Sequence, residues 1–290
     1  MKYLTTIHNI ENTEILLNEA SGLVVGLKGF STRETSLLTI AEFKKVSEIT
    51  NKMNKELYIS LKPMLYNDYV DGLKTLFEMI KDFYYTGVIV SDIGYYYLLS
   101  ELGVNNIIYN PETLLTNTVD FNSSIDIGIK GAFVAKEIHL DDIIQIAKNK
   151  KGKVFINAHG HLNMFYSHRK LLGSYFEHIN KVYDYENKTT LTLEEKRRKG
   201  KYPVIEDKFG THVYREKVST VIKYLNKLKM IDYFLIDTIF KDDIYAIMIL
   251  KMFKEGYTLK KEEELKNKYK EQWDNGFLDI KTIYKTNEKS

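Results

Sequence analysis

Four histidines and one arginine gather in a polar, aromatic segment between positions 154 and 180. They follow a short apolar run, Val154–Ile156, and are His159, His161, His168, His178 and Arg169. Histidine can transfer a proton near neutral pH or bind a metal, and a His-x-His pair on a strand places both rings on one side. No metal-site spacing such as H-E-x-x-H accompanies them, and no serine here lies in a G-x-S-x-G turn. The segment therefore predicts a functional loop, and we expect no bound metal.

Further charged side chains fall at or just after predicted strand ends. With the histidine and arginine above, they give the candidate catalytic residues Glu112, Lys136, Glu137, His159, Arg169 and Asp237. Parallel strands of a closed barrel all end on one face, so such side chains would converge on one mouth. Lys136 and Glu137 are adjacent, so only one can face the barrel interior. Structural roles stay open: a salt bridge or capped loop for the charged pair, and a backbone-bonded histidine in the His159-Gly160 turn.

Strand-like and helix-like segments alternate along the chain. The strand-like runs are Tyr3–Ile7, Leu23–Leu27, Leu57–Leu61, Val88–Val90, Asn106–Tyr109, Ala132–Ala135, Val154–Ile156 and Tyr233–Ile236. Most are continuously apolar, as in parallel strands that are buried on both faces. Eight such strands with helical crossovers predict a (β/α)8 TIM-type barrel, and a doubly wound α/β sheet is the alternative.

Several helices and one insertion can also be located. Ser31 and Glu34 form a capping-box pattern that predicts a helix to about residue 54, and apolar spacing predicts helices over 70–80 and around 218–225. The long gap before the last strand predicts an insertion, about 161–216, that contains a hairpin turning at 207–210. We therefore expect a barrel over residues 1–257 and a charged helical tail over 258–290, packed through Leu265 and Trp273.

The predicted insertion carries a basic cluster beside aromatic residues. Its candidate RNA-binding residues are Arg197, Arg198, Lys199, Lys201 and Tyr202. Cations that contact phosphates and rings that stack on bases are what single-stranded RNA requires. A run of lysines is also typical of an ordinary solvated surface, so the sequence alone leaves both interpretations open.

Composition excludes several kinds of chemistry. The chain of 290 residues has no cysteine, which excludes disulfides, a cysteine nucleophile and a cysteine-ligated iron–sulfur cluster, and we expect no cofactor. The net charge of +3 neither requires nor excludes a polyanionic partner. No apolar run approaches the ~20 residues that span a bilayer, and no signal-peptide pattern begins the chain. We therefore expect a cytoplasmic protein with no membrane partner.

Short motifs in consistent order resemble the peptidase U32 family, the collagenase-like peptidases, which also include RNA- and quinone-hydroxylation proteins. The segment after the seventh strand resembles the family pattern H-G-A-L-C-x-x-Y-S-G-R-C-x-x-S-x-Y at His159, Gly160, Leu162, Tyr166, Ser167, Arg169, Ser174 and Tyr175. Other matches are Gly26, Phe30 and Arg33, then Glu112 and Asn117, then Lys136 and Glu137, and finally Glu206, Asp207, Gly210 and Thr211. The resemblance implies the same barrel and the same mouth.

The family's cluster-binding cysteines are replaced in this chain. Asn163, Lys170 and Thr220 occupy three of the positions. In its length and its sequence motifs the chain resembles the short paralogue of the bacterial tRNA uridine 5-hydroxylation proteins. That resemblance implies a part in tRNA wobble-uridine hydroxylation, with tRNA and a longer, cysteine-bearing paralogue as partners. Because this chain has no cysteine to hold a cluster, we expect it to be a non-catalytic or co-catalytic subunit.

Two alternatives remain at the level of sequence. The first is the peptidase activity for which the family is named, which would rest on carboxylates such as Glu137, Glu206 and Asp207 and a water molecule. The second is a degenerate barrel that serves only as a protein-interaction module, and it predicts indifference to substitutions at the mouth.

Overall fold

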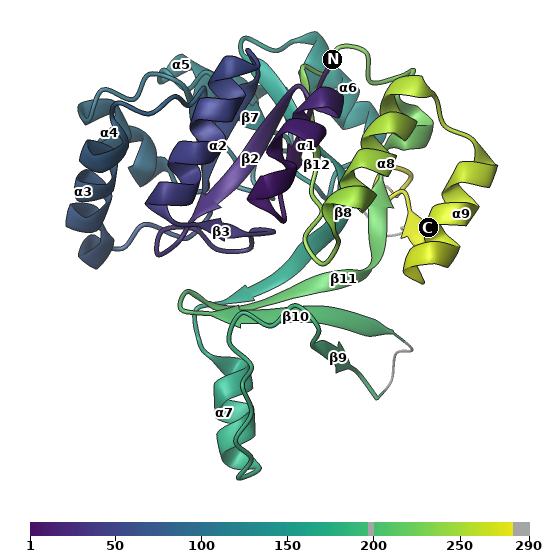
Figure 1. Cartoon of the computed structure of the whole chain (residues 1–290). Coiled ribbons are helices and arrows are strands. Elements are labelled where there is room, and N and C mark those ends of the chain that lie inside the picture. Colours follow the sequence, from purple (N-terminus) through teal and green to yellow (C-terminus); the bar gives the residue numbers. More distant parts are fainter. Residues whose placement is uncertain (197–199, 281–290) are drawn as a thin grey trace, which may run out of the picture.

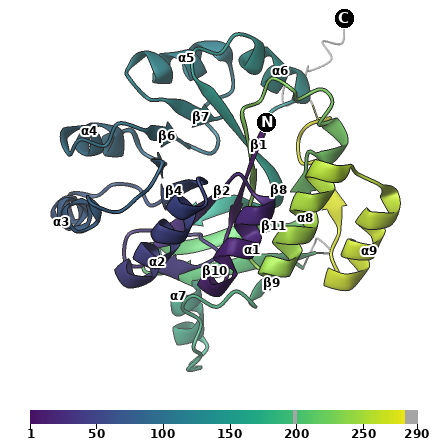
Figure 2. The same ribbon diagram turned by 45° about the horizontal axis from the view of Figure 1, so that its top comes forward.

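Among residues 1–196 and 200–280, which the computed structural model describes, eight parallel strands close into a barrel (Figures 1 and 2). They are β1 (Lys2–Thr6), β2 (Gly22–Leu27), β4 (Glu56–Leu61), β5 (Gly87–Val90), β6 (Ile107–Tyr109), β7 (Gly131–Phe133), β8 (Lys153–Ser167) and β12 (Tyr233–Ile236). Each pairs with the next, and β12 pairs with both β1 and β8, which closes the ring. The predicted barrel is confirmed, and the doubly wound alternative is wrong.

The barrel interior is filled rather than hollow. Every barrel strand contributes a buried side chain to one inner cluster, made of Leu4, Val24, Tyr58, Ile89, Ile108, Phe133, Phe155, Tyr233 and Leu235. The rings of Phe155 and Tyr233 stack with their centroids 4.2 Å apart. Side chains that fill the interior in layers are the usual core of this fold, so only the mouth above this layer is open to a ligand.

Helices cover the outside of the barrel, as Figure 2 shows. They are α1 (Thr13–Glu19), α2 (Ile40–Lys52), α3 (Val70–Ile80), α4 (Ile93–Glu101), α5 (Thr118–Asp126), α6 (Leu140–Lys148) and α8 (Asp243–Glu255). The helix predicted over 70–80 is confirmed as α3. The helix predicted to start at Ser31 begins later, because the capping box is formed by Thr39 and Glu42. Ser31 instead donates a hydrogen bond to the carbonyl oxygen of Ser60 inside the loop after β2.

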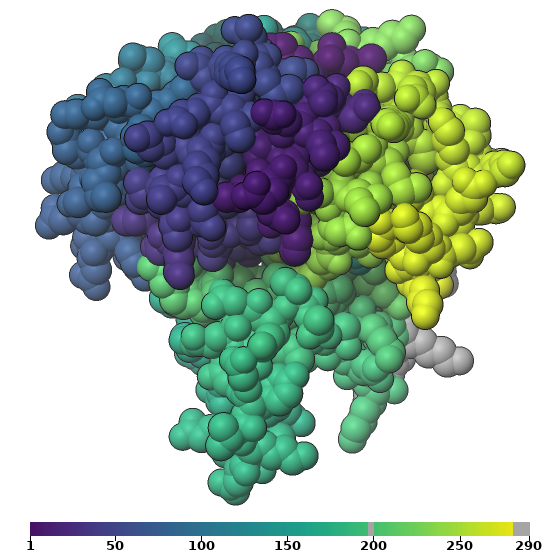
Figure 3. Space-filling view, in the orientation of Figure 1, coloured from purple at the N-terminus to yellow at the C-terminus, as the bar shows by residue number. Residues whose placement is uncertain are grey.

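An insertion replaces the crossover helix between β8 and β12, and it projects from one end of the barrel (Figures 1 and 3). Strand β8 continues beyond the barrel and leads into α7 (Leu171–His178), β9 (Thr192–Glu194), β10 (Lys201–Asp207) and β11 (Gly210–Thr220). The predicted hairpin is confirmed as β10 and β11. The helix predicted around 218–225 is wrong, because Val218 lies in β11 and only a 3-10 turn, Ile222–Tyr224, follows.

The C-terminal part packs back on the barrel and the insertion. Helix α9 (Leu259–Tyr269) buries Leu265, as predicted. Trp273 is not on that helix: it lies in β13 (Trp273–Asp274), which pairs with β11. The division into a barrel and a tail stays a prediction, and residues 281–290 lie outside the described part of the chain. Within the described part, no helix is long and apolar enough to cross a membrane.

Candidate functional site

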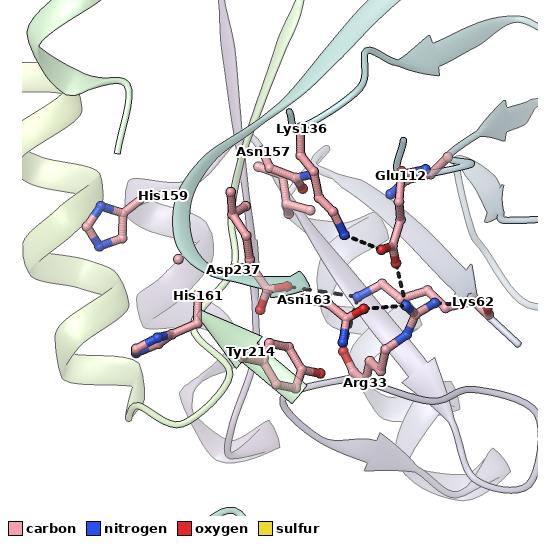
Figure 4. Close-up of a pocket in the computed structure, with 14 residues that line it drawn as sticks. Arg33, Lys62, Glu112, Lys136, Asn157, His159, His161, Asn163, Tyr214 and Asp237 are labelled. Atoms are coloured by element: carbon pink, nitrogen blue, oxygen red, sulfur yellow. Dashed lines mark hydrogen bonds and ion pairs between the residues drawn. The ribbon is translucent and has the colours of Figure 1, made fainter. Parts of the chain in front are cut away.

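A polar pocket lies at the mouth of the barrel, where the strands end (Figure 4). Its charged side chains come from five different loops: Arg33 after β2, Lys62 after β4, Glu112 after β6, Lys136 after β7 and Asp237 after β12. The pocket has a free volume of about 40 Å³, room for a few water molecules. Catalytic and binding groups of this fold sit on this face, so the pocket is the candidate functional site.

Glu112 is the centre of a buried ion network. Its two carboxylate oxygens lie 2.6 Å from a guanidinium nitrogen of Arg33 and 2.5 Å from the ammonium of Lys136. The side chains of Arg33 and Lys136 are only 9% and 6% exposed, so each depends on this carboxylate for compensation. Burial alone would raise the pKa of Glu112, but the two cations hold it at about 2. The carboxylate therefore stays ionised at every physiological pH.

The backbone holds Arg33 and Glu112 in a costly conformation. Both residues are left-handed, with φ of 58° and 62°. Non-glycine residues in this region carry strain of roughly 1–3 kcal/mol each, and they cluster at functional sites. The two strained residues here are partners in one ion pair, which supports the assignment of this mouth as the functional site.

Lys62 links the network to the opposite wall of the pocket. Its ammonium lies 3.2 Å from Glu34 and 3.9 Å from Asp237, and it donates a hydrogen bond to the carbonyl oxygen of Arg33. Burial works against a charge on Lys62, but Glu34 and Asp237 raise its pKa, so the cation persists. The pocket thus holds three fixed cations, two of them beside Glu112 and one between two acids.

Tyr214 closes the pocket from the insertion side. It lies on β11 and is 3% exposed, and its hydroxyl has no hydrogen-bond partner among the described residues. Nε of Arg33 is likewise buried and has no hydrogen-bond partner among the described residues. Burial raises the pKa of the Tyr214 phenol well above its ordinary value, so it stays a neutral donor. Unpaired buried donors in a pocket indicate groups that a ligand could satisfy.

A wider groove continues outward from the pocket, with a free volume of about 280 Å³. Arg33, Lys62 and Lys136 reach its floor. Its rim carries large apolar side chains that are about half exposed: Met64 at 53%, Met164 at 47% and Phe165 at 45%. The site therefore combines a charged floor, in which three cations accompany Glu112, with an exposed apolar rim.

Of the predicted catalytic candidates, Glu112, Lys136, His159 and Asp237 line the pocket, but the ring of His159 is turned away from the charged groups. Glu137 faces the outer groove rather than the ion network and makes no ion pair within the described residues. Arg169 is exposed on the insertion, where its carbonyl oxygen accepts a hydrogen bond from Thr211. Arg169 is therefore not among the residues that line the mouth.

His159 points away from the ion network, to the other side of β8 (Figure 4). Its Nε2 is 2.7 Å from the hydroxyl of Tyr245, which in turn donates to Glu271. The sequence left open a hydrogen bond between His159 and the backbone. In the structure the His159 ring bonds the Tyr245 hydroxyl instead. Burial lowers the pKa of His159 to about 3, so the ring is neutral and cannot act as a general acid near neutral pH.

Other residues of the pocket were not among the candidates: Arg33, Lys62, Asn163 and Tyr214. Lys62 follows directly after the predicted strand Leu57–Leu61, so the rule applied to Lys136 could have found it. Arg33 matched a family motif without being assigned to the site. Tyr214 gave no signal, because only the folded hairpin brings it over the mouth.

The RNA cluster predicted on the insertion is only partly described. Arg197, Arg198 and Lys199 lie outside the described residues. Lys201 forms an ion pair with Glu194, and Tyr202 packs against a small apolar cluster that includes Leu172 and Val204. An RNA contact at this cluster stays a prediction.

The iron–sulfur cluster that the family resemblance implies does not fit this chain. The three positions that could be aligned with its cysteines carry other side chains with other contacts: the Asn163 amide donates to the carbonyl oxygens of Phe165 and Val213, Lys170 pairs with Glu186, and the Thr220 hydroxyl accepts from the backbone of Ile222. Within the described residues, no group of three or more His, Asp or Glu side chains could hold a metal ion either.

Comparisons with known proteins bear on both fold and family. tRNA hydroxylation protein P2 of Bacillus subtilis (strain 168) is 28% identical over 287 residues, which cover 91% of this chain and 93% of that protein. The solved structure of the U32 peptidase Mk0906 superposes with a TM-score of 0.51 over 82% of this chain and 92% of that one, and at 13% identity it supports the fold alone. The model of peptidase family U32 matches residues 9–287, nearly the whole chain. The protein therefore belongs to peptidase family U32.

Proposed function

We propose that this protein takes part in the 5-hydroxylation of the wobble uridine of tRNA, as a cytoplasmic subunit that holds the RNA for a cysteine-bearing member of its family. The alignment with tRNA hydroxylation protein P2 over nearly the full length of both chains supports the reaction class. Hydroxylation of a ring carbon requires a redox centre or an activated oxygen donor. A chain without cysteine cannot hold a thiolate-ligated cluster, which supports a partner for the redox step.

The observation that carries the proposal is the combination of rim and floor at the barrel mouth. Met64, Met164 and Phe165 expose apolar surface around a groove whose floor holds three cations and the Glu112 carboxylate. An unstacked base has a flat apolar face and a polar edge, and proteins bind it by stacking on one and hydrogen bonding to the other. The groove offers both kinds of contact in one place.

The pocket below the groove suits the edge of uracil. Uracil carries two carbonyl oxygens, which need donors, and one ring N–H, which needs an acceptor. Arg33, Lys136 and the neutral Tyr214 hydroxyl are donors, and Glu112 is an ionised acceptor. In this role the chain's residues position the base and reject bases with a different polar edge. They take no part in the redox step.

The test is mass spectrometry of tRNA nucleosides from cells with and without the gene. We expect 5-hydroxyuridine derivatives to be lost on deletion and restored by the wild-type gene. A Met164→Ala/Phe165→Ala double variant should fail to restore them, because it removes the stacking rim while leaving the buried ion network intact. The matched control is Val119→Ala/Ile244→Ala, which shortens two apolar side chains that are 74% and 58% exposed on outer helices.

Two further experiments would test whether this chain acts together with the cysteine-bearing relative or duplicates its role. Affinity purification of this chain should recover the cysteine-bearing relative. If the nucleosides are unchanged both in the single deletion and in a deletion that also removes that relative, the proposed function is wrong. Equal restoration by the rim variant and its control would instead favour a barrel kept only for protein interaction.

Tyr214→Phe separates stability from function. Because the hydroxyl is buried without a partner among the described residues, its removal should leave the free energy of unfolding within about 0.5 kcal/mol of wild type, or raise it. Restoration of the nucleosides should nevertheless fall. The comparison is Tyr245→Phe, whose hydroxyl bonds His159 and Glu271, and which should cost about 1–3 kcal/mol in urea unfolding. A clear loss of stability in Tyr214→Phe would contradict the assignment of a free donor.

The peptidase alternative finds little support in two of the three carboxylates it would use, Glu206 and Asp207. Glu206 is fully buried and accepts hydrogen bonds from the backbone of Leu172 and Gly173 and from Thr211. Asp207 is buried as well and accepts from Thr32 and the backbone of Phe209. Glu206 is an anchor inside the insertion, and Asp207 ties the insertion to the loop after β2 through Thr32, so neither is free to activate a water molecule.

A further inference from the structure

A second charged surface lies at the opposite end of the barrel, where the strands begin. A cavity of about 420 Å³ is lined there by Lys2, Lys150, Lys153 and Lys229, together with Asp232. The lysines come from the start of β1, the turn before β8, the start of β8 and the loop before β12. In Figure 1 this end is at the top, beside the N-terminus and away from the insertion.

Two more lysines extend this surface. The carbonyl oxygen of Lys130, just before β7, accepts a hydrogen bond from the backbone of Lys153, and Lys151 lies two residues before Lys153. We call the six residues the basic end: Lys2, Lys130, Lys150, Lys151, Lys153 and Lys229. Except for Lys150, which is half-buried, they are exposed or have side chains that are more than half exposed.

Positive charge exceeds negative charge on the basic end. Within the described residues its lysines pair with three carboxylates: Lys2 with Glu56, Lys151 with Asp126, and both Lys150 and Lys153 with Asp232. Lys130 and Lys229 make no ion pair with any described residue. The six lysines therefore exceed by three the carboxylates with which they pair.

We infer that the basic end binds the phosphodiester backbone of RNA, at a distance from the base-binding mouth. Lysine ammonium groups are point charges that suit phosphates without reading sequence, and the release of counterions from the backbone drives such binding. A protein partner is disfavoured, because lysine is depleted at protein interfaces and the core of an interface is apolar. The lysines also come from segments far apart in sequence that the fold brings to one end of the barrel.

This inference rests on the proposed function only in its choice of RNA as the polyanion. The basic end and the mouth lie at opposite ends of the barrel. The mouth would hold the unstacked base, and the basic end would hold phosphates remote from it. Removal of charge from the basic end should therefore weaken binding of whole tRNA while leaving the recognition of a short anticodon-loop RNA unchanged.

The test measures the affinity of the purified full-length chain for unmodified tRNA across a salt series. In Lys153→Glu/Lys229→Glu we expect binding to weaken roughly tenfold at low salt. The slope of log affinity against log salt should become shallower by roughly 1.4–1.8, or 0.7–0.9 for each phosphate that the variant no longer neutralises. The two residues are suited to this test because Lys229 is unpaired in the described structure and Lys153 reaches Asp232 only at 4.0 Å.

The matched control is Lys45→Glu/Lys260→Glu. Both control lysines are exposed on outer helices, α2 and α9, and the change in net charge is identical. Thermal unfolding of both variants checks that each remains folded. Equal weakening in the two variants, or no binding of tRNA by the wild-type chain, overturns the inference. A further outcome is that the Lys153→Glu/Lys229→Glu variant binds tRNA weakly while cells that carry it keep their modified nucleosides. That result would support the basic end as an RNA-binding surface and count against its role in hydroxylation.

Discussion

Replacing Glu112 with glutamine should lower the free energy of unfolding by about 3–5 kcal/mol. The change removes the shared partner of Arg33 and Lys136, and it leaves two nearly buried cations without compensation. Removal of one member of a buried ion pair has this size of effect, because the remaining charge is desolvated and unpaired. Urea unfolding of the wild type and the variant measures the difference directly. The same variant should fail to restore the modified nucleosides.

Glu137→Gln is the matched control for this experiment. Glu137 undergoes the same chemical change next to Lys136, but it makes no ion pair within the described residues. Its stability should stay within about 0.5 kcal/mol of wild type, as for other surface substitutions. Similar losses for Glu112→Gln and Glu137→Gln would mean that the network around Glu112 does not stabilise the mouth.

The same carboxylate makes stability depend on pH in an acidic window. The pKa of Glu112 is held near 2 in the folded state, below the ordinary value of 4.5. A depressed pKa contributes stability above the unfolded value and loses it as the pH falls. The wild type should therefore lose roughly 3 kcal/mol of this contribution between pH 4.5 and pH 2. Glu112→Gln should lack that part of the pH dependence, whereas Glu137→Gln should keep it.

The barrel could be predicted because its signal is local. Each strand is a short apolar run that is buried on both faces, and such runs are visible one at a time in the sequence. Closure of the ring could not be read in this way, because it depends on the pairing of β12 with both β1 and β8. The predicted start of α2 was wrong because two signals competed. Ser31 fits a capping pattern, but its hydroxyl ties the loop after β2 to the end of β4.

His159 shows why strand position alone does not place a side chain. Phe155 points into the barrel core and Asn157 lines the mouth, so alternation would aim His159 inward as well. The register between β8 and β12 shifts at this point, with Leu235 opposite Asn157 and Ile236 opposite His159. The extra residue, Ala158, makes a bulge that turns His159 outward to Tyr245. A bulge of this kind leaves no pattern in a single sequence.

The candidate site itself was predictable in part and for a definite reason. Glu112, Lys136 and Asp237 lie within three residues of strand ends, and the convergence of strand ends brings such residues together. Tyr214 and Asn163 come from the insertion and from the extension of β8, so their positions depend on the antiparallel pairing of β8 with β11. The basic end was missed for a similar reason, because its six lysines come from separate segments that only the fold brings together.

Replacing Gly160 with alanine should destabilise the protein by more than the conformational cost of the substitution. Gly160 has a φ of +140° directly after the bulge, where an added Cβ would lie 2.3 Å from the carbonyl oxygen of Asp237. That oxygen belongs to the backbone, so it cannot move without shifting the loop after β12. We expect a loss of about 1–3 kcal/mol from backbone strain and a further 1–3 kcal/mol, roughly, from the clash.

Gly256→Ala separates these two costs. Gly256 follows α8 with a φ of +116°, and an added Cβ there meets nothing within 4 Å among the described residues, so only the backbone strain applies. In urea unfolding the loss for Gly160→Ala should exceed that for Gly256→Ala by roughly 1–3 kcal/mol. The excess should be accompanied by failure to restore the nucleosides, because the shift moves Asp237 and the mouth with it. Equal losses in the two variants would show that β8 and the loop after β12 can separate freely, and the mouth would then lack the rigid geometry on which base binding depends.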